Sequence, residues 1–173
     1  SDLKIIKDGK EDFMHYHEFV DTRHLRTTER RFEHTYNSIL WFNNSFYGLF
    51  RSSAVTRKML VKRFGFDYIF ILKLSLKGSF VQLKEKLFIK HFGGIGNSIE
   101  SNYKAIKKKK DLALYFPGVS FNLFLMRIVV LTESLSISQK FKAFMFLSKE
   151  SLEVHPYKFL EWTPRRLMFK VTF

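Results

Sequence analysis

Apolar residues recur along the first part of the chain in two different rhythms. Between residues 36 and 60 they stand three to four positions apart, a spacing that predicts an amphipathic helix with Asn37 or Ser38 as its cap. Continuous or alternating apolar runs over residues 68–76 and 79–89 predict strands, because they are rich in Ile, Phe, Leu and Tyr. This part of the chain therefore predicts a helix followed by strands.

The second half of the sequence gives further strand and helix signals. Residues 138–149 predict a helix whose cap is Ser136 or Ser138. Pro117-Gly118 predicts a turn. Strands are predicted over residues 112–116, 119–125, 127–133 and 165–173. The order helix, strands, helix, strand predicts an α+β fold, with small mixed or antiparallel sheets that each pack with a helix.

The charge of the chain is strongly one-sided. Its 173 residues include 30 Lys+Arg against 16 Asp+Glu, which gives a net charge of +14. Because 46% of the residues are hydrophobic, the chain has enough apolar material for a core and does not resemble a disordered basic tail. An excess of this size predicts a polyanionic partner, and the alternative is a basic solvated surface without one.

Cysteine and alanine usage adds two smaller points. The absence of Cys excludes disulfides, thiolate metal sites and Cys nucleophiles. Many Phe and Lys with few Ala are typical of A/T-rich coding DNA, as in many organelles. The start has no apolar signal region, which fits a protein made inside the organelle.

The uncharged run from Leu112 to Met126 is shorter than the roughly 20 residues of a membrane span.

Basic clusters interleaved with aromatic residues are the main candidate site. Lys and Arg displace counterions from phosphates, so such patches bind nucleic acid in a salt-dependent way, whereas each cluster alone can be a solvated face. The residues expected to bind RNA are Lys58, Lys62, Arg63, Lys107, Lys108, Lys109, Lys110, Lys140, Lys142, Tyr157, Lys158, Arg165 and Arg166.

Other motifs give weaker signals. Gly93, Gly96 and Ile99 fit a KH-type loop that clamps a nucleic-acid backbone, although a plain flexible loop has the same pattern. His15 and His17 could share a strand face, but no third metal ligand has a suitable spacing. The acids, among them Asp67 and Asp111, form no paired-carboxylate pattern. We therefore expect no enzyme activity, no metal and no cofactor.

Several short stretches resemble the L-six family of large-subunit ribosomal proteins. Gln139 and the later Pro156-Tyr157-Lys158 resemble, at a matching interval, a helix-opening Gln and a Pro-Tyr-Lys of that family. The other matching stretches are Asn43, Asn44 and Gly48 (a linker helix); residues 64–68 (a Gly-Val-Gly-Tyr segment); Pro117, Gly118 and Val119 (a turn); and Ile128, Val129 and Val130 (a strand).

The sequence departs from this pattern in places. Ile137 and Ser138 replace Asp-Lys, and residues 159–161 replace Gly-Lys-Gly. Residues 76–110 have no counterpart and are a probable insertion. Residues 1–35 are polar and read as an extension or a remnant first subdomain, and residues 36–173 as the L-six-like region.

The resemblance implies two similar α+β subdomains and a structural role in a mitochondrial large ribosomal subunit. The implied partners are ribosomal RNA near the factor-binding region and neighbouring ribosomal proteins, with no small-molecule substrate and no membrane span. Three alternatives stay open: a KH-like small-subunit ribosomal protein, an organellar nucleic-acid enzyme, and a protein that binds mainly other proteins.

Overall fold

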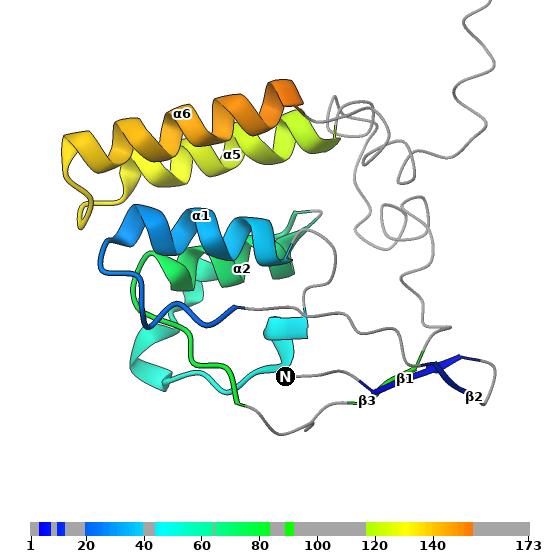
Figure 1. Cartoon of the computed structure of the whole chain (residues 1–173). Helices are drawn as coiled ribbons and strands as arrows, with labels where there is room; N and C mark the ends of the chain where they lie inside the picture. The colour runs from blue at the N-terminus through cyan, green and yellow to red at the C-terminus, as the bar shows by residue number, and fades with distance from the viewer. Residues whose placement is uncertain are drawn as a thin grey trace, which may run out of the picture.

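The helices of the protein lie in two layers, as Figure 1 shows. One layer holds α5 (Pro117–Leu131) and α6 (Ile137–Glu153), and the other holds α1 (Thr28–Ile39) and α2 (Phe66–Ser75). The computed structural model describes residues 4–7, 10–12, 20–39, 44–63, 65–83, 89–91 and 117–153. Each layer buries an apolar face against the other, which is the usual way in which helices form a core.

The first helix begins earlier than the apolar pattern predicts. α1 starts at Thr28 and ends at Ile39, so Asn37 and Ser38 lie inside it and do not cap it. The prediction of one helix over residues 36–60 is wrong. Three short 3-10 helices come after α1: η1 (Asn44–Tyr47), η2 (Ser52–Ala54) and η3 (Arg57–Met59). The buried face of α1 mixes polar residues with Phe32, which hides its helical rhythm in a hydropathy pattern. The boundary expected at residue 35 falls inside this helix.

The strand predicted over residues 68–76 is wrong, since this segment forms α2. Ile69, Phe70, Ile71 and Leu72 are four consecutive buried residues, so every side of the helix faces apolar neighbours. A short apolar run of this kind has no periodicity that separates a buried helix from a buried strand. Gly65 precedes the helix with a φ of 72°, a left-handed conformation that favours glycine.

The two strands predicted over residues 119–125 and 127–133 are also wrong, because both segments belong to α5. Pro117 opens this helix rather than making a turn, which suits proline because the first helical N–H has no partner within the helix. Ile128, Val129 and Val130, which resemble a strand of the L-six family, lie in the last turns of α5. Two of the segments that carry the resemblance, residues 117–119 and 128–130, are therefore helical.

The prediction of an α+β fold is also wrong. The residues whose side chains the structure describes form helices and turns, with no strand among them. Residues 79–83 lack regular structure. A small sheet lies to one side of the helices (Figure 1), with β1 (Lys4–Lys7) between antiparallel β2 (Lys10–Asp12) and parallel β3 (Ile89–His91). β3 begins at the last residue of the strand predicted over 79–89. The strands predicted over 112–116 and 165–173 lie outside the described residues.

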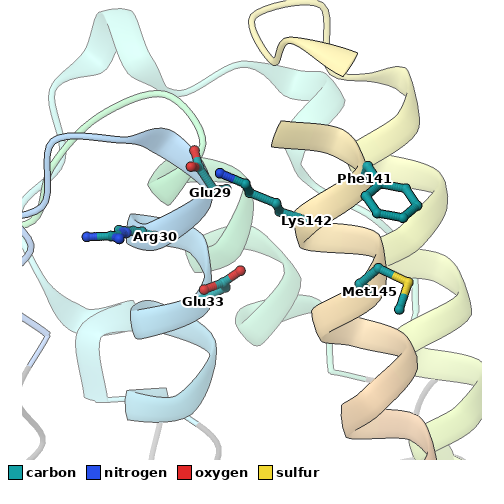
Figure 2. A pocket seen from close by; sticks show the side chains of 6 residues that line it. All are labelled: Glu29, Arg30, Glu33, Phe141, Lys142 and Met145. Carbon is teal, nitrogen blue, oxygen red and sulfur yellow. The ribbon is translucent and has the colours of Figure 1, made fainter. Parts of the chain in front are cut away.

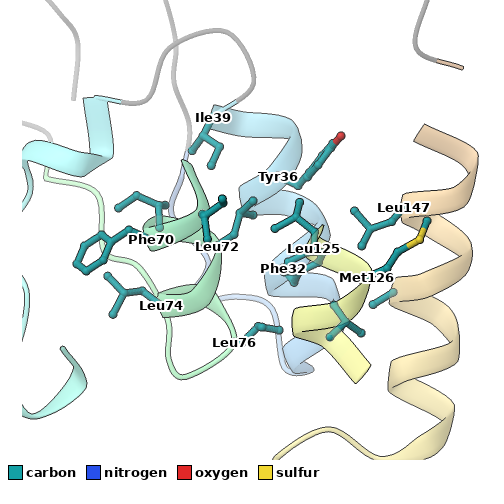
Figure 3. Packing of buried hydrophobic residues seen from close by; sticks show 14 of the residues in the cluster. Phe32, Tyr36, Ile39, Phe70, Leu72, Leu74, Leu76, Leu125, Met126 and Leu147 are labelled. Carbon is teal, nitrogen blue, oxygen red and sulfur yellow. The ribbon is translucent and has the colours of Figure 1, made fainter. Parts of the chain in front are cut away.

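One hydrophobic core joins all four helices (Figure 3). Phe32 of α1, Leu72 of α2, Leu125 of α5 and Leu147 of α6 are each almost wholly buried in it. The ring of Tyr36 meets the ring of Phe146 edge to face, with centroids 5.3 Å apart, and so ties α1 to α6. Removing a buried ring such as Phe32 costs about 3–5 kcal/mol in comparable cores.

The turn between α5 and α6 ends in a capping box. The Gln139 amide donates to Ser136 Oγ at 3.3 Å, and the Ser136 amide donates to Gln139 Oε1 at 2.9 Å. These reciprocal bonds satisfy amides that the first turn of a helix leaves without partners. The prediction of a helix here is confirmed, with Ser136 as its cap, and Gln139 opens the helix for a local physical reason.

Segments on either side of α1 and α2 are also joined. The Thr22 amide donates to the Phe80 carbonyl at 3.1 Å, and the Phe80 amide donates to Thr22 Oγ1 at 2.8 Å. Asp21 accepts from the guanidinium of Arg23 at 2.6–3.0 Å. This pairing lowers the pKa of Asp21 well below its usual range, although burial opposes the shift. The segment before α1 is therefore fixed to the segment after α2.

Candidate functional site

The basic loop, residues 51–63, contains η2 and η3 and connects the first helix to the second. It carries five basic side chains and no acidic one. Four of them, Arg51, Arg57, Lys58 and Lys62, are exposed. None of these four forms an ion pair with another described residue. The loop therefore presents a concentration of positive charge that the surrounding described surface does not neutralise.

Two lysines of α2 and the turn after it hold this loop in place. Lys73 Nζ donates to the Lys58 carbonyl at 2.9 Å, and Lys77 Nζ donates to the Ala54 carbonyl at 3.1 Å. Burial lowers the pKa of Lys73. Met59, which is buried in the core, anchors the middle of the loop. These contacts fix the backbone, so the exposed cations project from defined positions.

Arg63 has a different role from its neighbours in the sequence. Its guanidinium donates to the Ser120 carbonyl at 3.0 Å and to Ser120 Oγ, and it lies 4.8 Å from the centre of the Phe124 ring. Hydrogen bonds and a cation–π contact with α5 thus occupy the charged group. Arg63, an expected RNA ligand, connects the basic loop to α5 in this structure.

Lys140 and Lys142 do not form one patch. They stand two residues apart on α6, and since a helix turns 100° per residue, they are about 200° apart around its axis. Lys142 faces α1, where Glu29 and Glu33 lie (Figure 2). These carboxylates balance the charge of Lys142, so it attracts phosphate less than the cations of the basic loop do.

The groove between α1 and α6 is a feature that we did not predict from the sequence. It has a volume of about 420 Å3 and is lined by Glu29, Arg30, Glu33, Phe141, Lys142 and Met145 (Figure 2). Glu29 and Glu33 are four residues apart, a spacing that places two side chains on one face of a helix. That spacing was the available signal, but it has meaning only once residues 28–39 are known to be helical.

Several predicted site residues lie outside the described residues. Among the expected RNA ligands these are Lys107, Lys108, Lys109, Lys110, Tyr157, Lys158, Arg165 and Arg166. The Gly93–Ile99 loop, His15, His17 and Asp111 also lie there. Their predicted roles stay predictions.

The acidic and imidazole side chains of the described residues do not gather into a metal site. The described residues contain no group of three or more His, Cys, Asp or Glu side chains that could hold a metal ion. Asp67 lies in the first turn of α2, where a negative charge stabilises the helix dipole. His24 and His34 meet edge to face with their ring centroids 5.8 Å apart.

The lengths and charges of the helices also bear on membrane association. Of the helices in the described ranges, none combines the length and the apolar character that crossing a membrane requires.

Comparisons with known proteins do not assign this chain to a family. No protein-family model matches the chain, and no match emerges among curated proteins or among solved structures.

Proposed function

We propose that this protein binds a polyanion, specifically nucleic acid, through the basic loop. The observation that supports this proposal is the cluster of Arg51, Arg57, Lys58 and Lys62, exposed on a segment without any acid. Phosphate contacts from such side chains release condensed counterions, which supplies sequence-independent affinity. The protein acts in this proposal as a binding module without a catalytic step.

The charge distribution favours this loop over other described surfaces. Residues 44–83 hold seven basic and one acidic side chain, a net charge of +6. Residues 117–153 hold four basic and three acidic side chains, a net charge of +1. Nearly half of the excess charge therefore lies within 40 residues around the basic loop, and long-range steering of a polyanion would direct it there.

Single-stranded RNA suits this loop as a ligand because its phosphates are accessible without a groove of defined width. A ribosomal location in a mitochondrion, with rRNA and ribosomal proteins as partners, is the narrower prediction from the L-six resemblance. The helical α2 and α5 remove the fold-based reason for that narrower role. The proposal therefore rests on the charge of the basic loop and not on the resemblance.

The test compares two triple variants that remove the same charge. Arg57→Gln/Lys58→Gln/Lys62→Gln changes the basic loop, and Arg26→Gln/Arg127→Gln/Lys149→Gln changes three basic residues on other elements. Binding of a fluorescent single-stranded RNA is followed by anisotropy over a series of salt concentrations. The loop variant should lose at least tenfold in affinity, and its log–log salt slope should fall by about 2, since each phosphate contact contributes about 0.7.

The control variant should keep most of the affinity and slope. Equal losses in the two variants would show that net charge alone attracts the RNA, which would contradict a site at the basic loop. Salt-independent binding of the wild-type protein would contradict the whole proposal. Circular dichroism of each variant checks that the helices are intact.

A further inference from the structure

The groove between α1 and α6 combines charged and apolar walls (Figure 2). Glu29, Arg30 and Glu33 line it from α1, and Phe141, Lys142 and Met145 line it from α6. Its volume of about 420 Å3 is that of a small ligand site. It lies on different elements from the basic loop, so a ligand here is independent of the proposed polyanion binding.

Glu29 is the most unusual group in this groove. Its side chain belongs to a residue only 5% exposed, and its Oε2 atom is buried without a hydrogen-bond partner. Burial raises the pKa of Glu29, but its own backbone amide and the nearby Thr27, Gln139 and Lys142 outweigh burial and leave the pKa below its ordinary value. The carboxylate is therefore charged at neutral pH while one of its oxygens lacks a donor, which is a costly state for a buried group.

Glu33 adds a second negative charge one turn further along α1. Burial raises its pKa and repulsion from Glu29 raises it further, although the positive charges of Arg30 and Lys142 oppose the shift. Like charges four residues apart on a helix destabilise each other. A cation in the groove would relieve the repulsion between the two carboxylates further than Arg30 and Lys142 do.

The wall of the groove on α6 combines Lys142 with two apolar side chains that are open to solvent. Phe141 is 64% exposed and Met145 is 52% exposed, although both side chains are large and apolar. Such side chains suit the methylene stem of a ligand, and the Phe141 ring face attracts a cation. A bare metal ion would use neither feature, and the described residues supply no third acidic or imidazole ligand here.

We propose that this groove binds an organic cation with an apolar stem, most suitably a guanidinium group. Two N–H donors of a planar guanidinium match carboxylate oxygens better than an ammonium does, because they point in fixed directions. Glu29 and Glu33 accept these hydrogen bonds, and the stem lies on Phe141 and Met145. Lys142 and Arg30, which also line the groove, compete with the ligand for the negative charge.

The test uses the methyl group of Met145 as a reporter in carbon-13 methionine NMR of the whole chain. n-Butylguanidinium is the cationic probe, and n-butylurea is a neutral probe of nearly the same shape. The cation should shift the Met145 resonance to saturation, and the urea should not. The resonance of Met59, which is buried in the core away from the groove, should stay in place and so reports that the fold is intact.

Three variants make the result specific. Glu29→Gln should weaken binding at least tenfold, because it removes the charge and keeps the shape. Lys142→Gln should strengthen binding severalfold, because it removes the competing cation. Glu133→Gln, which changes an exposed acid in the turn after α5, should leave the affinity unchanged.

A second arm distinguishes the two sources of such a cation. A short peptide with one arginine is compared with the same peptide carrying citrulline, which lacks the charge. A preference for the arginine peptide over butylguanidinium would identify a protein side chain as the ligand, and the reverse would identify a free small molecule. Equal shifts from butylguanidinium and butylurea, no shift from any cation, or unchanged binding in Glu29→Gln would overturn the proposal.

Discussion

The hydroxyl of Tyr36 donates a hydrogen bond of 2.9 Å to Asn122 Oδ1 inside the core, across 86 positions of the sequence. Asn122 Nδ2 donates in turn to Ser151 Oγ at 3.1 Å, and Ser151 Oγ donates to the Leu147 carbonyl at 2.7 Å. Tyr36 and Asn122 are both almost fully buried. This chain of polar groups joins α1, α5 and α6, and it fixes their relative position more specifically than apolar contacts can.

Removing the Tyr36 hydroxyl should destabilise the protein measurably. Tyr36→Phe keeps the ring that packs on Phe146 but leaves Asn122 Oδ1 buried without its donor. We expect the free energy of unfolding to fall by about 1–3 kcal/mol, the cost of an unsatisfied buried polar group. Urea unfolding followed by circular dichroism measures it. Tyr47→Phe, at a side chain that is 69% exposed, should change stability by less than about 0.5 kcal/mol.

The same hydroxyl should ionise only in strongly alkaline solution. Burial, reinforced by the charge of Glu150, raises the pKa of Tyr36 from 10.0 to about 12. Because the folded protein holds this proton more tightly than the unfolded chain does, the stabilisation is complete below pH 10 and is lost between about pH 10 and 12. The phenolate absorbance of the wild type minus that of Tyr36→Phe isolates this group, and a difference curve centred near pH 10 would contradict the burial of Tyr36.

The sequence predicted one helix boundary correctly, and the reason is local. The helix α6 has a capping residue, a Gln three positions later and apolar residues in helical rhythm, so all its signals lie within a few residues of each other. Its other apolar positions, such as the exposed Ile137 and Phe141, also fit that rhythm. No distant contact was needed to infer this helix.

The helices α2 and α5 were mistaken for strands because their neighbours decide their structure. Ile, Phe and Val favour strands when a sheet is present, but here these residues are buried by helices that come from other parts of the chain. One signal favoured a helix: ten of the thirteen residues 119–131 are apolar, and a mean strand has only about 5–6 residues. The length of this apolar segment therefore indicated its structure better than its residue types did.

The candidate sites show the same limit. Part of the basic loop could be predicted, because the charge of Lys58, Lys62 and Arg63 needs no knowledge of the fold. Arg51 and Arg57 of the same loop were not among the predicted ligands. Lys58 and Lys62 are exposed, whereas the guanidinium of Arg63 binds Ser120. Nothing in the sequence indicates this difference. The groove depends on α1 lying beside α6, which no local pattern predicts.

A side chain at position 65, in place of Gly65, should lower the stability of the protein. Its φ of 72° is unfavourable for residues with a Cβ, and an added Cβ would lie 3.4 Å from Phe121 Cε2. We expect Gly65→Ala to lower the free energy of unfolding by about 1–2 kcal/mol. Gly78→Ala is the matched control, because a Cβ there meets no atom within 4 Å. Equal stabilities of the two variants in urea would contradict the left-handed start of α2.

The capping box of α6 predicts which serine begins the helix. Ser136→Ala removes the acceptor of the Gln139 amide, so we expect a loss of about 1 kcal/mol in the free energy of unfolding. Gln139→Ala removes the return bond to the Ser136 amide and should cost less, because its partner lies at an exposed position where water replaces the bond.

A double variant shows whether the two residues act together. If the bonds are reciprocal, the losses from Ser136→Ala and Gln139→Ala should not add, because each change removes part of the same pair. Ser138→Ala is the control: this exposed residue lies within the first turn of α6, where alanine favours the helix more than serine does. A loss for Ser138→Ala that matches the loss for Ser136→Ala would show that α6 begins at a different residue, and it would contradict the capping box.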